Sequence, residues 1–375
     1  MHKKITPYKT IGIIGGGQLG RMMALAAKAM GYFVAVLEPT AKCPTGQVCD
    51  MEITAPYNDL DAIKKLAAVS DVITYEFENI DYEALTWLEK NAYLPQGSQV
   101  LHTTKHRFRE KSAIAAMGVP VPEFVLIDSV ETLEKNIRYP SVLKTTTGGY
   151  DGKGQVLIRS EADLPEAREL AASNECILEE FMNFSCEVSV IVARSTTGET
   201  AVFPVAENIH VNKVCHKCIV PARISKKVEE EAIAHAVTIA NSLGSIGVLA
   251  IEMFVVNDKI YINELAPRPH NSGHYTIDAC QTSQFEQHVR AVCGLPLGDT
   301  SLHTPVVMVN ILGNHLNKED MSNLEAYMPL MANSKLHLYG KGQDKAVANS
   351  KMGHINVLGD HAKTLKQIDD TGIWG

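Results

Sequence analysis

Apolar runs and helical patterns alternate near the start of the chain. An apolar run over residues 10–15 ends in glycines, a helical pattern follows from Gln18 to Met30, and a second run covers Phe33 to Leu37. This succession predicts a β-α-β unit. Helical patterns over 59–68 and 82–90 flank a third predicted strand at 72–75. Roughly the first 100 residues are therefore expected to form a small open α/β sheet.

The pattern changes after a basic helix predicted from Lys105 to Met117, because a glycine and two prolines follow it. Residues 124–185 predict short strands, a glycine-rich loop and one helix, and residues 186–265 predict further strands and a hairpin. The remaining expected helices and strands are 161–172, 228–243 and 283–293 (helices) and 306–312, 335–339 and 354–358 (strands). The tail from about residue 300 is predicted to be a small β-rich domain.

Charge and hydropathy restrict the class of partner. The 375-residue chain has a net charge of −8 and no long basic run, which argues against nucleic acid or an anionic membrane. No apolar stretch approaches the roughly 20 residues that a bilayer requires. The apolar segment near Met1 is too short for a secretion signal. We therefore expect a cytoplasmic protein that acts on small molecules.

Eight cysteines are scattered along the chain, as expected for reduced thiols. Only Cys215 and Cys218 have the spacing of metal ligands, and His210 and His216 lie nearby. A structural zinc site needs further ligands, and the chain has no second C-x-x-C pair. A loop with incidental thiols is the favoured interpretation.

A glycine-rich segment over Lys144–Gln155 has four glycines within seven residues and a lysine near each end. Apolar runs before and after it predict a loop that closes a β-hairpin. The bare backbone can approach a phosphate, so the segment predicts a lid over a nucleotide. It is not a G-x-x-x-x-G-K-[ST] loop, and an ordinary flexible hairpin is the alternative.

A second glycine motif, Gly15–Gly20, fits G-x-G-x-x-G, and Glu38 follows at the end of the second predicted strand. Taken alone, this fingerprint favours a nicotinamide-dependent oxidoreductase. Its physics requires only an anion at a helix N-terminus, which a substrate monophosphate also satisfies.

Two carboxylates occur within the apolar strands of the hairpin predicted at 248–265. Buried carboxylates are costly unless they are paired or bind a metal, and magnesium prefers such oxygens. A three-residue loop over 257–259 would place Glu252 opposite Glu264, whereas a two-residue loop would pair Glu252 with Asn263. A magnesium site needs the first register, or a bulge with the same effect. Solvated glutamates on an edge hairpin are the alternative.

The segment directly after this hairpin carries Arg268, His270 and His274 among two prolines and a glycine. An arginine can grip an oxyanion with two hydrogen bonds, and a histidine can move a proton near neutral pH. Together with the lid and the carboxylates, this predicts ATP-dependent phosphoryl transfer to a carboxylate-like acceptor.

The chain resembles the 5-(carboxyamino)imidazole ribonucleotide synthases of the ATP-grasp superfamily. The segments that carry the resemblance, in order, are Gly15–Arg21, Tyr75–Asn79, Lys144–Gln155, Asn183–Glu187, Ile262–Arg268, His270–His274 and Lys351–His354. The resemblance implies an α/β and α+β chain with an N-terminal open α/β domain (1–104), an ATP-grasp domain (105–299, with a lid at about 118–183) and a β-rich C-terminal domain (300–375). It also implies carboxylation of aminoimidazole ribonucleotide with ATP and bicarbonate through carboxyphosphate, in purine biosynthesis, by a homodimer.

The resemblance also implies roles for individual residues. Those expected to hold ATP are Arg107, Lys144, Gly149, Tyr150, Asp151, Gly152, Lys153, Gly154, Gln155, Glu179, Glu180, Phe181, Met182, Glu187, His210, Asn263 and Glu264. Those expected at the second substrate are Gly17, Gln18, Leu19, Glu76, Asn271, Ser272, Lys341 and Lys351. Catalytic roles fall to Arg268, His270, Tyr150 and Asp151, and Glu252 and Glu264 would bind magnesium, with manganese as the alternative.

One position departs from the family pattern. Many relatives have an arginine where this chain has Ser350, so Lys345 is an alternative to Lys341 in the phosphate clamp. The competing functions are a sibling ATP-grasp ligase such as formate-dependent glycinamide ribonucleotide transformylase or biotin carboxylase, the oxidoreductase, and a non-catalytic nucleotide-binding regulator.

Overall fold

The N-terminal segment forms a parallel four-stranded sheet, as its alternating pattern predicts. The computed structural model describes residues 3–149, 154–316 and 323–374. The strand order is β3-β2-β1-β4, with β1 (Thr10–Ile14), β2 (Phe33–Glu38), β3 (Met51–Thr54) and β4 (Val72–Tyr75). The helices of this part are α1 (Gln18–Ala29), α2 (Leu60–Val69), α3 (Tyr82–Asn91) and α4 (Gln99–Thr104). Ile14 pairs with Tyr75, so the loops after β1 and β4 meet at one sheet edge.

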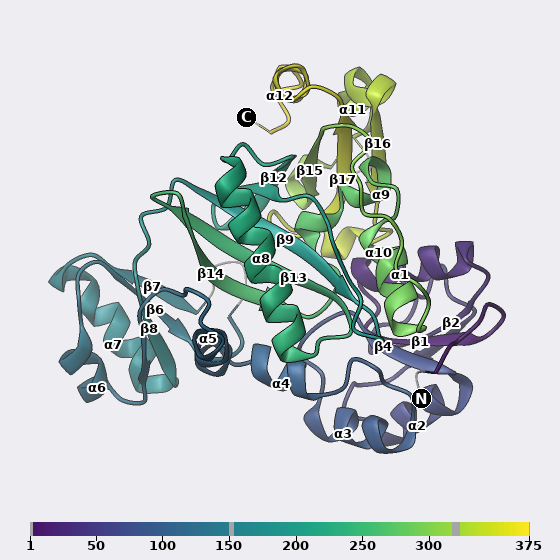
Figure 1. Ribbon diagram of the computed structural model, residues 1–375, viewed down its shortest axis with the longest axis horizontal. Helices are drawn as coiled ribbons and strands as arrows, with labels where there is room; N and C mark the ends of the chain where they lie inside the picture. Colours follow the sequence, from purple (N-terminus) through teal and green to yellow (C-terminus); the bar gives the residue numbers. More distant parts are fainter. Residues whose placement is uncertain (1–2, 150–153, 317–322, 375) are drawn as a thin grey trace.

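A second, antiparallel sheet forms a separate lobe at the left of Figure 1. Its order is β5-β8-β6-β7, with β5 (Phe124–Ile127), β6 (Ser141–Thr145), β7 (Gln155–Ile158) and β8 (Cys176–Glu180). Its helical segments are α6 (Val130–Asn136), the short η1 (Glu161–Asp163) and α7 (Leu164–Ser173). Lys144 pairs with Gln155, which confirms that the glycine-rich segment joins the strands of a hairpin.

The largest sheet, nine-stranded within the described ranges, runs through the centre of the molecule (Figure 1). Its order is β14-β13-β9-β11-β12-β15-β17-β16, and β10 pairs with β9. Its strands are β9 (Cys186–Arg194), β10 (Thr200–Val202), β11 (Ala206–Val211), β12 (Val214–Val220), β13 (Gly247–Val256), β14 (Lys259–Ala266), β15 (Val306–Leu312), β16 (Ser334–Leu338) and β17 (Lys351–Leu358). The three tail strands therefore extend this sheet through the β12–β15 pairing.

Helices cover this sheet and link it to the first one. They are α5 (Arg107–Ala116), α8 (Lys226–Leu243), α9 (Thr276–Ala279), α10 (Gln284–Val292), α11 (Leu324–Tyr327) and α12 (His361–Asp370), with short turns η2 (Asn271–Gly273), η3 (Gly313–His315), η4 (Met328–Asn333) and η5 (Gln343–Lys345). The basic helix begins later than the pattern predicts. His106 is its N-cap and its ring nitrogen accepts from the Arg109 N–H, so the helix starts at Arg107.

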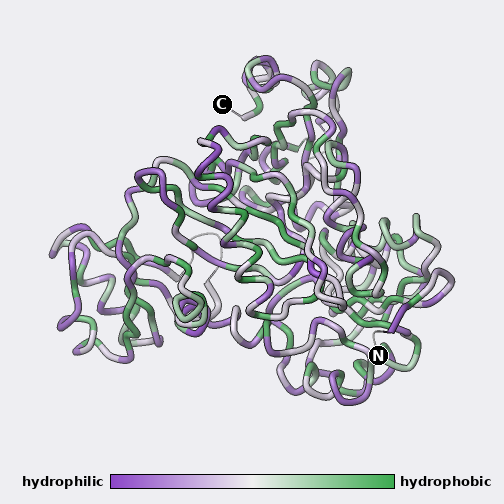
Figure 2. Tube along the Cα trace, in the orientation of Figure 1, coloured by the Kyte–Doolittle hydropathy of each residue, from purple (hydrophilic) through white to green (hydrophobic). Residues whose placement is uncertain are grey.

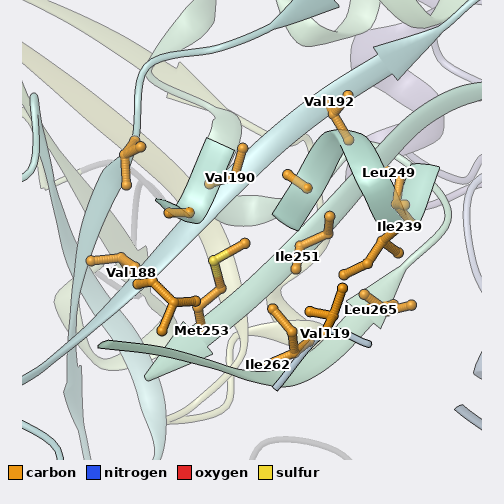
Figure 3. Packing of buried hydrophobic residues seen from close by; sticks show 14 of the residues in the cluster. Val119, Val188, Val190, Val192, Ile239, Leu249, Ile251, Met253, Ile262 and Leu265 are labelled. Carbon is orange, nitrogen blue, oxygen red and sulfur yellow. The ribbon is translucent and has the colours of Figure 1, made fainter. Parts of the chain in front are cut away.

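The main core lies between α8 and the strands β9, β13 and β14 (Figure 3). Every second residue of β13 enters it, as alternation along a half-buried strand requires: Leu249, Ile251, Met253 and Val255. Figure 2 shows hydrophobic residues concentrated along these central strands. In the described residues, no helix is long and apolar enough to span a bilayer.

Candidate active site

A cavity of about 560 Å³ lies where the lid sheet, the central sheet and the loop after β4 meet. Most of the residues expected to hold ATP, the metal or bicarbonate line it, together with two of those expected at the second substrate. For ATP, metal and catalysis they are Arg107, Lys144, Gly149, Gln155, Glu179, Glu180, Phe181, Met182, Glu187, His210, Glu252, Asn263, Glu264, Arg268 and His270, and for the second substrate Asn271 and Lys351. Tyr150, Asp151, Gly152 and Lys153 lie outside the described residues. Gly154, Gly17, Gln18, Leu19, Glu76, Ser272 and Lys341 are described but do not belong to the lining.

Glu252 and Glu264 face each other across β13 and β14 because β14 contains a bulge. The turn is the two-residue type, Asn257-Asp258, with φ of 51° and 57°. A regular ladder would then pair Glu252 with Asn263. Instead, Met253 pairs with Ile262 and Glu252 with Glu264, so Asn263 is the extra residue. The register needed for a two-carboxylate site is present, through the bulge rather than a three-residue loop.

The pairing brings two carboxyl groups together in the cavity, and each makes ionisation of the other less favourable. Burial and the neighbouring Glu264 raise the pKa of Glu252 to about 8. Burial also opposes ionisation of Glu264, but the positive charge of Arg107 has the larger effect, so the pKa of Glu264 is lowered. Arg107 Nη1 lies 3.1 Å from Glu264 Oε2. Two carboxylates whose charges are mutually unfavourable suit a divalent cation. In the described residues no third acidic, histidine or cysteine ligand completes a site, so phosphate oxygens and water would fill the magnesium sphere.

Two lysines and a glutamate form a buried charge cluster beneath the lid. Lys144 Nζ donates to Glu179 Oε2 at 2.7 Å, and Lys111 Nζ lies 3.9 Å from Oε1. Burial alone would raise the pKa of Glu179, but Lys111 and Lys144 outweigh it and hold it at about 2. Arg107 also donates to the Gly149 carbonyl at 3.1 Å. The cluster places cations at the end of the cavity where the lid begins.

Another part of the lining carries a carboxylate, an imidazole and two aromatic rings. Glu187 Oε2 lies 2.9 Å from His210 Nδ1. Burial would lower the pKa of His210, but the contact with Glu187 raises it to about 9. Phe184 and Phe254 stack with centroids 4.7 Å apart, and both line the cavity. Neither aromatic residue was assigned a role from the sequence. For Phe254 the sequence does contain a signal. This residue follows Glu252 by two positions, so both side chains lie on the same face of the strand.

The loop after β14 is fixed by side chains from two other parts of the chain. Arg268 Nη2 lies 2.8 Å from Glu78 Oε1, a residue after β4 that sequence reasoning did not assign. Gln284 accepts from the His270 N–H at 2.9 Å and donates to its carbonyl at 2.7 Å. Burial and then Arg268 lower the pKa of His270 well below its usual value, so this imidazole is neutral, a narrower role than the sequence allowed. Asn271 is buried and lines the cavity.

The Gly15–Gly20 loop packs against carboxylates of the protein itself. Glu38 accepts from the Gly16 N–H at 2.8 Å, and Glu76 accepts from the N–H groups of Gly17 and Gly20. A Cβ at Gly17 would lie 2.7 Å from Glu76 Oε1. The absence of a side chain at these glycines leaves room for the glutamate side chains. The N–H groups of Gly16, Gly17 and Gly20, which a cofactor pyrophosphate would use, are therefore already hydrogen-bonded. The oxidoreductase interpretation loses its physical basis here.

The tail contributes two lysines of different character. Lys341 Nζ donates to the Lys351 carbonyl at 2.7 Å, and burial lowers its pKa to about 8. Lys345 is mostly exposed and lies 3.8 Å from Asp344, while its carbonyl accepts from Ser350 Oγ. Neither Lys341 nor Lys345 lines the cavity, so the choice between them for the phosphate clamp stays a prediction.

Cys215 and Cys218 lie on strand β12, which corrects the expectation of a loop. Their sulfur atoms are 3.5 Å apart and both residues are buried. Within the described ranges, no group of three candidate ligands forms around them.

A lid hairpin, a pair of carboxylates on a central antiparallel sheet and a cation cluster between them define an ATP-grasp enzyme, an ATP-dependent ligase. Residues 8–104 match the ribonucleotide synthetase preATP-grasp domain, 112–285 the ATP-grasp domain and 306–368 the phosphoribosylaminoimidazole carboxylase C-terminal domain. The N5-carboxyaminoimidazole ribonucleotide synthase of Bacillus subtilis is 52% identical over 94% of this chain and 92% of its own. The chain belongs to the N5-carboxyaminoimidazole ribonucleotide synthase family.

Solved structures agree with this assignment. An N5-carboxyaminoimidazole ribonucleotide synthetase solved as its ADP complex is 58% identical, covers 100% of this chain and 99% of its own, and superposes with a TM-score of 0.95. The synthase of Aspergillus clavatus, solved with ADP and 5-aminoimidazole ribonucleotide, is 30% identical with a TM-score of 0.89, covering 98% of both chains. Both cover essentially the whole chain, so the likeness extends beyond the ATP-grasp core.

The charge cluster predicts a pH-dependent contribution of Glu179 to stability. Its folded pKa of about 2 lies below the unfolded value of roughly 4.3, so the contribution is full above about pH 4.3 and is lost as the pH falls towards 2. Glu179→Gln leaves the buried Lys111 and the part-buried Lys144 without their counter-charge and should cost about 3 kcal/mol at pH 7. Urea unfolding from pH 7 to pH 3.5 should show the gap to wild type narrowing. The exposed neighbour Glu180→Gln is the control, and a pH-independent gap would contradict the prediction.

Proposed function

We propose that this chain carboxylates the amine of 5-aminoimidazole ribonucleotide, using ATP and bicarbonate, in de novo purine biosynthesis. The observation that carries the proposal is the pairing of Glu252 with Glu264 in the cavity that Arg268, Lys144 and Arg107 also line. Family membership supports the substrate. We further propose magnesium as the metal, with manganese as the alternative, a cytoplasmic location and a homodimer.

In this proposal the chain's cations hold ATP for in-line transfer of its γ-phosphoryl group. Arg107 and Lys144 contact the phosphates, and the lid covers them. Magnesium, when bound by Glu252 and Glu264, would neutralise charge on the transferred group. An oxygen of bicarbonate bonds to the γ-phosphorus as the bond to ADP breaks, which yields carboxyphosphate. Arg268 is placed to grip the bicarbonate oxygens.

The second half of the reaction forms the carbon–nitrogen bond. The substrate amine attacks the carboxyl carbon of carboxyphosphate, the carbon–oxygen bond to phosphate breaks, and the departing phosphate takes the proton that the nitrogen loses. Neutral His270 donates or accepts a hydrogen bond without adding charge beside Arg268. Asn271 and Lys351 line the same cavity and would contact the ribonucleotide, and Gln284 holds the His270 backbone in place.

The direct test is phosphate release from ATP. Release should require both aminoimidazole ribonucleotide and bicarbonate, and the carboxylated product should form in equal amount. Release that ignores the ribonucleotide would contradict the proposal. Activity with formate and glycinamide ribonucleotide would favour the sibling ligase, and micromolar nicotinamide binding would favour the oxidoreductase.

Glu264→Gln should lower kcat strongly while changing the stability of the fold only slightly. The substitution keeps the side-chain shape but removes one of two charges that the metal needs, so kcat should fall at least about 100-fold. The thermal midpoint should change by only a few degrees, because removing Glu264's charge also relieves Glu252. Parallel assays of kcat and of thermal unfolding check this. An equal collapse of both would indicate a structural role.

The tail lysines should differ in their effect on the ribonucleotide. Lys351 lines the cavity, whereas Lys345 is exposed beside Asp344. Lys351→Met should raise KM for aminoimidazole ribonucleotide about 10-fold or more and leave KM for ATP nearly unchanged. Lys345→Met is the matched control, with KM values near wild type. Equal effects of the two substitutions would refute the assignment of the phosphate clamp.

A further inference from the structure

The bulge in β14 is the feature that brings Glu264 opposite Glu252, so whatever stabilises the bulge controls the carboxylate pair. Apolar positions record the shift: Ile260 and Ile262 are two apart, but the next core residue is Leu265, three further on. In a regular strand Leu265 would point to the other face. Figure 3 shows Ile262 and Leu265 both directed into the core with Met253.

The bulge backbone is bound by a lysine that the active-site assignments leave out. Lys111 Nζ donates to the carbonyls of Ile262 at 2.9 Å and of Asn263 at 2.6 Å. These are the carbonyls of the extra residue and of the residue before it. Lys111 is 1% exposed, so the two bonds are formed away from water. A bulge leaves ladder groups unpaired, and a buried unpaired carbonyl is costly.

The residue before Lys111 holds the other side of Glu264. Glu110 Oε2 accepts from the Leu265 N–H at 3.2 Å, and Glu110 is 2% exposed. Arg107, one helical turn earlier on α5, contacts the Glu264 carboxylate itself. One face of α5 therefore binds the backbone at 262, 263 and 265 and the side chain at 264.

We propose that Lys111, supported by Glu110, is a positioning residue that selects the bulged register of β14 and so sets the Glu252–Glu264 pair. It acts through the backbone of Ile262 and Asn263, not by contact with substrate. Without its two hydrogen bonds, a regular ladder from the same two-residue turn places Asn263 opposite Glu252 and moves Glu264 to the next pair. The inference rests on the proposed function for the metal pair and goes beyond it by naming what fixes its geometry.

The test compares Lys111→Met with the control Lys217→Met. Lys217 lies on β12 and contacts Asp369 of α12. The probe is Mn²⁺ titrated by electron paramagnetic resonance in saturating ADP. Lys111→Met should bind Mn²⁺ about 10- to 100-fold more weakly and lose about 100-fold in kcat/KM. Lys217→Met should bind Mn²⁺ like wild type. Wild-type Mn²⁺ affinity in a folded Lys111→Met protein would overturn the proposal.

A double-mutant cycle separates this proposal from the proposed function. If Lys111 acts only by placing Glu264, Lys111→Met should change Mn²⁺ affinity little further in a Glu264→Gln background. Full additivity would overturn the proposal. If Glu264→Gln alone left Mn²⁺ binding unchanged, the assigned metal site would be wrong. The register would then still be tested by hydrogen exchange of the Leu265 amide, which should speed up in Lys111→Met.

Deletion of Asn263 keeps the proposal testable if Lys111→Met fails to fold. Without the extra residue, Glu264 follows Ile262 directly and a regular ladder pairs it with Glu252, so the lysine is no longer needed for register. Lys111→Met should then fold in the deletion background, even where it fails to fold in the otherwise wild-type chain. Equal destabilisation in both backgrounds would assign Lys111 a general role in packing and overturn the proposal.

Discussion

Two carboxyl groups held face to face across β13 and β14 are the constraint on which the rest of the site depends. Glu252 and Glu264 disfavour each other's charge, and the fold accepts this cost at one end of its largest sheet, where β14 is the outermost strand. Arg107 offsets part of the charge on Glu264. With its pKa raised to about 8, Glu252 is mostly protonated near pH 7, and a divalent cation bound between the two carboxyl groups would favour its ionised form.

The three sheets meet at the cavity, and each contributes side chains to it or to its support. The lid sheet supplies Lys144 and Glu179, the central sheet supplies the carboxylates, and the loop after β4 supplies Glu78, which binds Arg268. The parallel sheet uses its glycine loop for internal packing against Glu76, not for a cofactor. A G-x-G-x-x-G segment can therefore bind a cofactor phosphate in one protein and a glutamate of its own chain in another, because a helix N-terminus binds any anion.

Much of the fold follows from local pattern. The strand Val72–Tyr75 has the predicted bounds, and the lid hairpin and the helix ending at Leu243 were expected from alternation and periodicity. The bulge was only an alternative, although the change from two- to three-residue spacing before Leu265 records it. Burial of Lys111 was not predictable from its segment, because a charged helix looks solvated until another strand packs on it. The hydrogen bond from the Gly17 N–H to the Glu76 carboxylate forms because β1 lies beside β4. That pairing is set by the topology and cannot be read from the local sequence.

The pairing of β12 with β15 has a consequence for how this architecture changes over evolution. The segments that match separate domain families share one hydrogen-bonded sheet, with Val306 to Val309 paired to β12 on one side and to β17 on the other. A lineage that discarded the tail would bare a long apolar edge at β12, and such edges recruit other chains. The tail strands and the catalytic strands are therefore one hydrogen-bonded unit, and loss of either part would expose an edge of the other.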